Sequence, residues 1–361
     1  PFEPLVLLSE SRLPLLAGRV SLLFVVPPRS HSQMPLYEPV LAAGVRDQTS
    51  EEARLRLDVV QKIESAIRLF GFEPLFTPLI ERFDTLPGQY GTQPEREILA
   101  LETASEERRE DVLRYDLTVP LARYVARERR NLPLPIKRYQ IGTVVRDVSG
   151  DGRPPRSREL SQADADIIGV ESRWADAECI AVAYQILRDL EVPGWEIRIN
   201  NRKLFRGLQP ILGITSEARF LAVVRAVNRL TTRPEAEVRQ QLEQEGDLDD
   251  SQVDRLFETL RLPADLPLPA QLEEAGRRLQ ESEVAQAGID ELSQTIEGLE
   301  ILGVPIERVR LDLFTTRSLD YYTSTVFKTH LPALPKLGSV ISGGGYGDML
   351  AGFLGEVIPA V

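Results

Sequence analysis

Arginine and carboxylate side chains gather in four short segments where strands or loops are expected. The segments contain Arg114, Asp116 and Thr118; Arg146; Arg156, Arg158, Glu159, Gln162 and Asp166; and Arg317, Asp320, Tyr321 and Tyr322. Ionised side chains on a sheet are costly to bury unless they are paired or bind a ligand. Guanidinium groups suit phosphate oxygens, and carboxylates suit an ammonium group. The pattern favours electrostatic chemistry on a small charged molecule and a phosphate, although buried ion-pair networks give similar patterns.

The sequence offers no nucleophile with a paired base. It contains two histidines, His31 and His330, and one cysteine, Cys179. No Ser-His-Asp or Cys-His arrangement can be assembled from so few residues. The same counts leave no His/Cys cluster for zinc and no internal disulfide, and they favour a reducing, cytoplasmic setting.

The chain is acidic overall. It has 43 Lys and Arg residues against 55 Asp and Glu residues, a formal charge of -12. No global positive field therefore indicates nucleic-acid binding. Arg123 to Arg130 or Arg198 to Arg206 could supply a local basic patch for a nucleic acid, but either stretch alone more often forms a solvated charged face.

The first part of the chain carries no pattern that predicts a function. Its longest apolar stretch, Val20 to Val26, is too short to span a bilayer and is followed by Pro27-Pro28. We therefore expect no transmembrane helix. Met34 lies shortly before the first helix signal, so residues 1–33 are expected to form a poorly ordered extension.

A long helix is expected to begin after Thr49. The sequence from Thr49 to Glu52 has the pattern of a capping box. Apolar residues then recur at helical spacing as far as Leu69, and Gly71 ends the helix. A short strand is expected over Glu73 to Leu79.

The chain from 111 to 170 is expected to form a strand, a helix, a strand, a loop and a strand. Short apolar runs alternate there with arginine-rich turns, and the loop from Asp147 to Ser157 contains glycines and prolines. Gln162, Asp164 and Asp166 alternate along the last strand. Their side chains are therefore expected to face the same side.

A change in composition indicates an inserted helical module over residues 205–303. This part is rich in Leu, Glu, Arg and Gln at period 3.6 and has almost no strand signal. Before it we expect a helix over Asp176 to Leu190 and a strand over Trp195 to Ile199, and after it strands over Val309 to Phe314, Tyr321 to Thr329 and Ser339 to Ser342. The expected fold class is α+β, with a mostly antiparallel sheet that the module interrupts.

Four segments, in this order, resemble histidyl-tRNA synthetases. They are Leu113-Arg-Tyr-Asp-Leu-Thr-Val-Pro-Leu-Ala-Arg-Tyr124, Arg156-Ser-Arg-Glu-Leu-Ser-Gln-Ala-Asp-Ala-Asp-Ile-Ile-Gly169, Ile197-Arg-Ile-Asn-Asn-Arg-Lys-Leu204 and Arg317-Ser-Leu-Asp-Tyr-Tyr-Thr-Ser-Thr-Val-Phe327. The match runs with gaps from about Gly44 to the end. It implies a class II synthetase catalytic domain over 44–204 and 304–361, with an antiparallel sheet flanked by helices. Residues 205–303 would be the inserted helical domain and 1–43 an N-terminal extension.

The resemblance implies roles for several arginines. Arg146 matches the arginine of the second class II motif, which is expected to grip the α-phosphate of ATP and the carboxylate of the amino acid. Arg156 and Arg158, with Glu159 beside them, match the loop where the outer phosphates are expected. Arg317 matches the arginine that stabilises charge during adenylate formation, so Arg146 and Arg317 are the expected catalytic residues.

The resemblance also implies a pocket for histidine. Matching positions receive the α-amino group and the imidazole or form the pocket wall: Asp116, Thr118, Gln162, Asp166, Tyr321 and Tyr322. Neighbouring residues of a strand point to opposite faces, so one of the two tyrosines belongs in the core. We expect Tyr322 to be the one in the pocket.

Structural alternatives stay open for other charged and polar residues. Arg158 and Glu159 could form a salt bridge that supports the loop. Asp320 could pair with a neighbouring arginine. Asn200 to Arg202 fit a turn with its hydrogen bonds better than a ligand site.

The implied reaction is the ATP-dependent ligation of histidine to the histidine tRNA. The histidine carboxylate attacks the α-phosphate in line, Mg²⁺ and arginines offset the charge, and pyrophosphate leaves. The acyl group then passes to the terminal adenosine of the tRNA. The resemblance also implies a homodimer, built on the helix from Ser50 to Leu69 and the strand that follows.

The sequence departs from the family pattern in three places. Tyr346 and Gly347 stand where an arginine and a tyrosine are usual, which is expected to weaken the imidazole pocket. Ser157 separates the loop arginines. The chain ends at Val361, before the third motif and the anticodon-binding domain, and we expect a truncated chain. Two alternatives remain: a histidine-binding regulatory subunit that partners ATP phosphoribosyltransferase, and a ligase with a non-tRNA acceptor.

Overall fold

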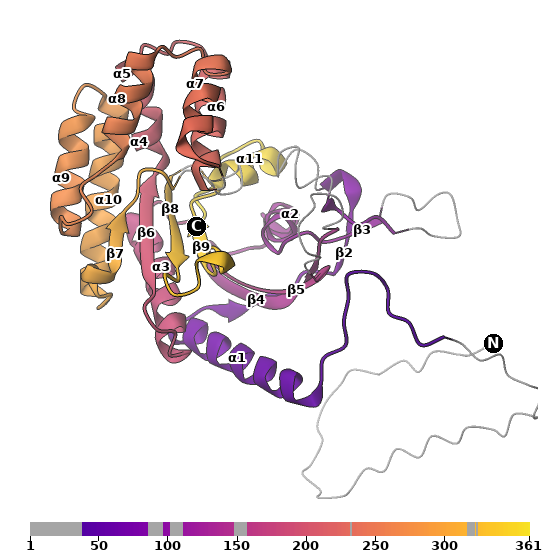
Figure 1. Ribbon diagram of the computed structural model, residues 1–361. Helices are drawn as coiled ribbons and strands as arrows, with labels where there is room; N and C mark the ends of the chain where they lie inside the picture. Colours follow the sequence, from indigo (N-terminus) through magenta and orange to yellow (C-terminus); the bar gives the residue numbers. More distant parts are fainter. Residues whose placement is uncertain are drawn as a thin grey trace, which may run out of the picture. The chain divides into compact units, whose positions relative to one another are not determined.

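The computed structural model describes residues 38–85, 97–101, 111–147, 157–231, 233–315, 322 and 324–361 (Figure 1). Residues 42–361 form one compact unit, and residues 1–41 are grouped separately. Almost all of the expected N-terminal extension and of the loop from Asp147 to Ser157 therefore lies outside the described residues.

The first helix, α1 (Ser50–Leu69), begins as predicted. The Thr49 hydroxyl accepts a hydrogen bond from the Glu52 amide at 3.2 Å, and the Glu52 carboxylate accepts one from the Thr49 amide at 2.8 Å, which completes the capping box. The strand expected after it is shorter. Only β1 (Glu73–Pro74) and β2 (Ile80–Arg82) form, because Pro74 and Pro78 lack the amide that a continuous ladder needs.

A long antiparallel pair dominates the first sheet. β4 (Ile136–Val145) pairs with β5 (Glu159–Ile168) along its full length, and β1 lies parallel to β4 on the other side. β3 (Asp111–Leu113) pairs with β2, and α2 (Thr118–Glu128) follows it. The predicted order of strand, helix, strand and strand is therefore confirmed. In Figure 1, α2 lies on one side of β4 and β5 and α1 lies on the other.

The second sheet joins segments from before and after the helical module. Its order is β7 (Val309–Leu311), β6 (Glu196–Asn201), β8 (Thr325–His330) and β9 (Ser342–Gly344). β6 and β7 are parallel, and the other neighbours are antiparallel, so the prediction of an interrupted, mostly antiparallel sheet is confirmed. The strand expected over Ser339 to Ser342 begins later, because residues 340–341 bend and the Ser339 hydroxyl donates to the Ile341 carbonyl.

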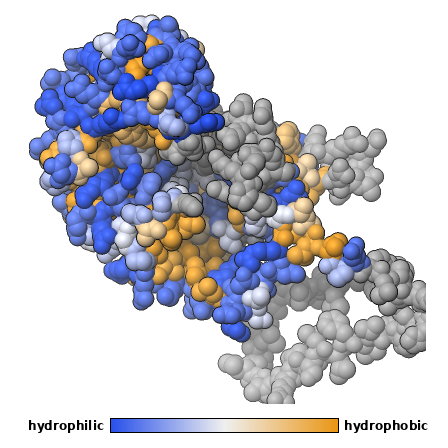
Figure 2. Space-filling view, viewed as in Figure 1, coloured by the Kyte–Doolittle hydropathy of each residue, from blue (hydrophilic) through white to orange (hydrophobic). Residues whose placement is uncertain are grey.

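Helices fill the chain between the strands of the second sheet. α3 (Arg173–Asp189) precedes β6, and α10 packs against both α3 and α4. The run comprises α4 (Arg202–Arg206), α5 (Leu208–Ile211), α6 (Glu217–Asn228), α7 (Glu235–Gln244), α8 (Asp250–Leu260), α9 (Leu268–Arg278) and α10 (Glu283–Ile301). Figure 2 shows a mostly hydrophilic surface over its outermost helices. The domain limits at 205 and 303 stay a prediction.

Two apolar clusters support the sheets. The larger one lies between the sheets and helices α1, α3 and α4 to α10. The smaller one joins α2 to α11 (Gly347–Leu354) and includes Tyr115, Ile168 and Tyr346. The last residues lie beside β5, where Ile167 and Val361 exchange backbone hydrogen bonds of 2.8 and 3.0 Å. The smaller cluster therefore borders the polar face of β4 and β5.

Candidate functional site

The polar face of β4 and β5 carries three rows of cross-strand partners. Arg138 lies opposite Asp166, Gln140 opposite Asp164, and Gly142 opposite Gln162. The Gln162 amide donates to Asp164 at 2.9 Å, which confirms that these alternating residues of β5 share a face. The opposite face packs on helices, since the Tyr139 hydroxyl donates to Glu64 of α1. One face of the sheet therefore carries the polar site residues.

The turn before α2 brings Asp116 and Thr118 to this face. The buried Asp116 carboxylate accepts a hydrogen bond of 3.1 Å from the Val119 amide at the beginning of α2. An anion is stabilised there by the free amides of a helix N-terminus. The Thr118 hydroxyl donates to Asp164 at 3.3 Å, so this turn and β5 form one polar surface.

Arg146, just after β4, is fixed by its surroundings. Its Nε donates to the Tyr115 carbonyl at 3.1 Å, its Nη2 donates to Gln162 at 3.3 Å, and its guanidinium lies 4.4 Å from the centre of the Tyr115 ring. Burial raises the pKa of Tyr115 to about 12, and its hydroxyl donates to Glu97. Arg146 therefore borders the surface formed by Gln162 and Asp164, and its role in binding a phosphate stays a prediction.

Asp166 is the most buried carboxylate on β5. The Tyr346 hydroxyl donates to its Oδ1 at 2.8 Å, and Arg138 Nε lies 3.0 Å from its Oδ2. The pKa of Asp166 is raised to about 6, mainly by burial, with Asp164 adding to this rise and Arg138 and the Tyr346 hydroxyl opposing it. Asp166 thus has two buried polar neighbours that the sequence did not assign to the site.

Both missed neighbours left a signal in the sequence. Arg138 is a charged residue in the first half of β4 and is buried, and a buried charge needs a partner. Tyr346 follows the glycine stretch, where we expected a weaker imidazole pocket, but its ring is buried and its hydroxyl reaches Asp166. Neither residue could be placed without the pairing register of β4 and the path of the chain after β9.

Arg114 has a supporting position. Its guanidinium donates to the carbonyls of Thr143 and Thr77 at 2.8 Å each, so it ties the end of β3 to β4 and to the segment before β2. It crosses the sheet where Gly142 has no side chain. A Cβ at Gly142 would lie 2.5 Å from Arg114 Nη2, so glycine makes this crossing possible.

The loop residues before β5 are only partly described. Arg158 donates to Asp147 at 3.0 Å, so its ion-pair partner is Asp147 and not Glu159, which is exposed at the start of β5. Successive strand residues point to opposite faces, which separates the side chains of Arg158 and Glu159. The Arg158 stem also packs on Gly44, whose φ is +78°. Arg156 lies outside the described residues.

The other expected substrate contacts fall in the segment before β8. Arg317, Asp320 and Tyr321 lie outside the described residues. Tyr322 packs against the smaller apolar cluster, and a Cβ on Gly344 would lie 3.1 Å from its ring. The pocket roles of these residues stay predictions.

Asn200 and Asn201 have structural partners, as expected. The Asn200 amide donates to the carbonyls of Leu313 and Thr315, and Asn201 caps α4 through the Lys203 amide.

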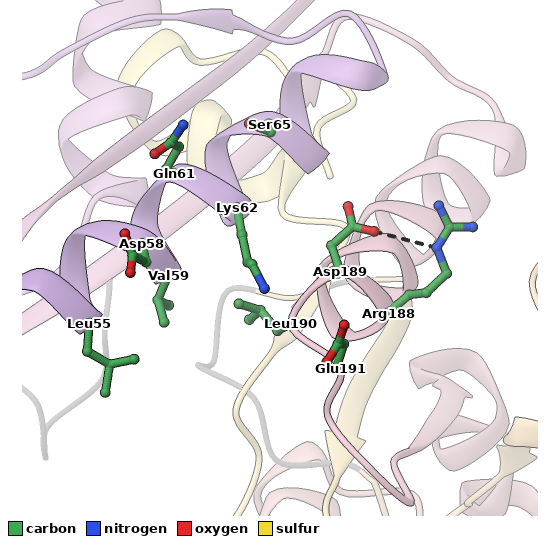
Figure 3. A pocket seen from close by; sticks show the side chains of 10 residues that line it. All are labelled: Leu55, Asp58, Val59, Gln61, Lys62, Ser65, Arg188, Asp189, Leu190 and Glu191. Carbon is green, nitrogen blue, oxygen red and sulfur yellow. Dashed lines mark ion pairs between the residues drawn. The ribbon is translucent and has the colours of Figure 1, made fainter.

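A surface groove lies elsewhere, between α1 and the end of α3 (Figure 3). Leu55, Lys62 and Leu190 are among its lining residues, and none of the site residues above lines it. No helix in the described ranges is long and apolar enough to cross a membrane. Those ranges also contain no group of three His, Cys, Asp or Glu residues arranged to hold a metal ion.

Comparison with known proteins gives a consistent result. The family profile described as Histidyl-tRNA synthetase matches residues 44–361. The histidine--tRNA ligase of Gloeobacter violaceus is 38% identical over 331 residues, which cover 85% of this chain and 68% of the relative. The crystal structure of histidyl-tRNA synthetase from Nostoc sp. PCC 7120 superposes with a TM-score of 0.79 at 31% identity, covering 90% of this chain and 73% of that one.

A second solved structure shares the fold at lower identity. It is described as an ATP phosphoribosyltransferase regulatory subunit/histidyl-tRNA synthetase from Bacillus halodurans C, with a TM-score of 0.76 and 23% identity over 91% of this chain and 80% of that one. At this identity the likeness shows the fold alone. The family profile and the more similar relatives go further, and the chain belongs to the histidyl-tRNA synthetase family.

Proposed function

We propose that the protein is a histidine--tRNA ligase, which activates histidine with ATP and transfers it to the histidine tRNA. The observation that carries the proposal is the continuous polar surface made by Asp116, Thr118, Gln162 and Asp166 beside Arg146. These residues come from three separate segments, and they are the ones that the family resemblance assigns to substrate. Family membership adds independent support.

The acidic part of this surface suits the histidine substrate. Asp116 and Thr118, at the beginning of α2, would receive the α-ammonium group with Gln162. Asp166 would accept a hydrogen bond from the imidazole. Tyr322 and Tyr321 are proposed for the pocket wall.

The arginines suit the nucleotide. Arg146 would bind the α-phosphate and the substrate carboxylate, while Arg156 and Arg158, next to Glu159, would bind the outer phosphates. Arg317 would stabilise the charge that develops as pyrophosphate leaves. We propose that Mg²⁺ arrives with the phosphates of ATP and offsets their charge.

The reaction needs positioning more than covalent catalysis. The histidine carboxylate would attack the α-phosphorus in line with the departing pyrophosphate, which forms histidyl-adenylate. The adenylate would then transfer its acyl group to the terminal adenosine of the tRNA. A homodimer is part of the proposal, because α1 and the segment after it expose the apolar side chains of Leu55, Leu57, Leu69 and Phe76. We also propose a cytoplasmic location, which the single cysteine favours.

Histidine-dependent ATP–pyrophosphate exchange tests the proposal, with Arg317→Ala as the site variant and Arg310→Ala as the matched control. Arg310 lies on β7 and its guanidinium donates to a backbone carbonyl, so its loss should not affect exchange. We expect Arg317→Ala to lower kcat by roughly a hundredfold or more, the loss typical of one transition-state donor. Histidine binding without exchange by the wild type would contradict the ligase function and favour the regulatory subunit.

A further inference from the structure

We infer that Arg138 is a positioning residue of the histidine pocket: it holds Asp166 as an oriented carboxylate that accepts a hydrogen bond from the neutral imidazole of the substrate. The inference rests on the proposed function. Arg138 itself is not assigned to bind substrate. It acts through Asp166.

The geometry connects Arg138 to both halves of the pocket. Arg138 and Asp166 are direct cross-strand partners on β4 and β5, and their side chains are 2% and 8% exposed. The Nη2 of Arg138 donates to the Leu117 carbonyl at 3.3 Å. Leu117 lies between Asp116 and Thr118, so one guanidinium supports both the imidazole side and the ammonium side of the proposed pocket.

The ion pair between Arg138 and Asp166 leaves hydrogen-bonding capacity unused. Arg138 Nε and Nη1 and Asp166 Oδ2 are buried and make no hydrogen bond with the described residues. Buried polar atoms are nearly always hydrogen-bonded, so each exception needs an explanation. Arg123 and Glu81 show the closed alternative, in which Arg123 donates one hydrogen bond of 2.8 Å to each oxygen of the Glu81 carboxylate. The open geometry at Asp166 fits a carboxylate that is oriented for a further partner.

The charges around Asp166 explain why it needs an arginine. Asp164 on β5, Tyr346 after β9 and the buried Cys179 thiol of α3 face it in addition to Arg138. Burial and Asp164 raise the pKa of Asp166, whereas Arg138 and Tyr346 lower it. Without Arg138 the carboxyl would hold its proton at higher pH. A protonated carboxyl presents a hydrogen where the imidazole N–H needs an acceptor.

The test compares Arg138→Met and Arg138→Lys with Arg173→Met in histidine-dependent exchange. Arg173 is the matched control, because it pairs with the buried Asp176 at 2.9 Å on α3, outside the site. We expect Arg138→Met to raise the KM for histidine roughly ten- to a hundredfold and to leave the KM for ATP unchanged. The acid limb of kcat/KM for histidine should move to higher pH. Arg138→Lys keeps the positive charge, so the acid side of its pH profile should match that of the wild type. It should restore only part of the affinity for histidine, because an ammonium group cannot form the two-pronged contacts of a guanidinium.

Several outcomes would overturn the inference. A wild-type histidine KM and acid limb in Arg138→Met would do so, and so would an equal rise in the KM values for histidine and ATP. If Arg138→Met does not fold, Arg138→Lys decides, and kinetics identical to the wild type would count against the inference.

Failure of the proposed function would look different, since the wild type itself would then lack histidine-dependent exchange. Calorimetric titration with histidine tests the ion pair without any chemistry. Weaker binding by Arg138→Met supports the inference, equal binding overturns it, and a wild type that binds no histidine overturns both proposals.

Discussion

Asp166 on β5 and Asp176 on α3 are both buried, and each faces an arginine. Burial is the main cause that raises their pKa values, to about 6 for Asp166 and about 7 for Asp176. Their surroundings differ. Arg138 and Asp166 keep buried polar atoms without hydrogen bonds to the described residues, whereas Arg173 donates to Asp176 at 2.9 Å.

The junction around Asp176 is a closed network. Glu291 of α10 accepts hydrogen bonds from Asn201 at 2.7 Å and from Lys203 at 2.8 Å, and Arg173 lies 4.0 Å from it. The Thr325 hydroxyl of β8 accepts a hydrogen bond from Asn201 at 3.4 Å and helps to lower the pKa of Asp176. The network therefore joins the second sheet to α3, α4 and α10. If Asp166 binds histidine as proposed, a buried aspartate with a raised pKa can belong to a structural junction or to a ligand site, and the completeness of its hydrogen bonds would distinguish the two.

The largest expected effect is on the stability of the closed network. Arg173→Met leaves Asp176 and Glu291 without their guanidinium, and breaking a buried ion pair in this way destabilises a protein by about 3–5 kcal/mol. Chemical denaturation measures the change. The exchange activity of Arg173→Met per folded molecule should stay at the wild-type level. If this variant instead lost affinity for histidine selectively, the region around Asp176 would not be purely structural.

A smaller effect is expected when each carboxyl is replaced by an amide. Asp166→Asn should lower kcat/KM for histidine roughly a hundredfold, which corresponds to about 2.7 kcal/mol, because an amide is a weaker acceptor than a carboxylate. Asp176→Asn should leave kcat/KM unchanged. Steady-state pyrophosphate exchange measures kcat/KM for both variants. Equal losses of kcat/KM in the two variants would contradict the proposed difference between a ligand site and a structural junction.

The smallest effect is a difference in pH dependence. In the folded state Asp176 keeps its proton up to about pH 7, whereas the unfolded chain releases it near the ordinary value of 3.8. The wild type should therefore lose stability as pH rises through this window, because the folded state binds more protons there. Asp176→Asn has no carboxyl to titrate and should not show this loss. As pH rises through the window, the Tm of Asp176→Asn minus the Tm of the wild type should therefore increase by a few degrees, on the order of the shift for 1 kcal/mol. Asp166→Asn should show the same trend only up to about pH 6, and thermal scans without either trend would refute this account.

Much of the fold was predictable because it depends on local signals. The capping box at Thr49 and the alternation of Gln162, Asp164 and Asp166 need only neighbouring residues, and both predictions are confirmed. Strand lengths were less predictable, since Pro74 and Pro78 divide a segment whose apolar residues favoured one strand.

Part of the candidate site could not be predicted for a physical reason. Asp166 was recognisable from its motif, but the contacts of Arg138 and Tyr346 with it depend on sheet register and on a chain path between distant segments. Local sequence patterns do not encode either of these. The roles proposed for Arg156, Arg317 and Tyr321 rest on the family resemblance alone.

The second sheet also has a consequence for the order of folding. β6 pairs only with strands that follow the helical module, and Asn200 donates to a carbonyl 113 residues later in the chain. During synthesis, Ile197 and Ile199 of β6 cannot be buried in the second sheet until the ribosome has made the module, β7 and β8. Helices form from local contacts in microseconds or less, whereas distant strands pair slowly because a long loop must close first. We therefore expect the helices of the module to form first and to shorten the loop that must close before β6 can pair with β7 and β8.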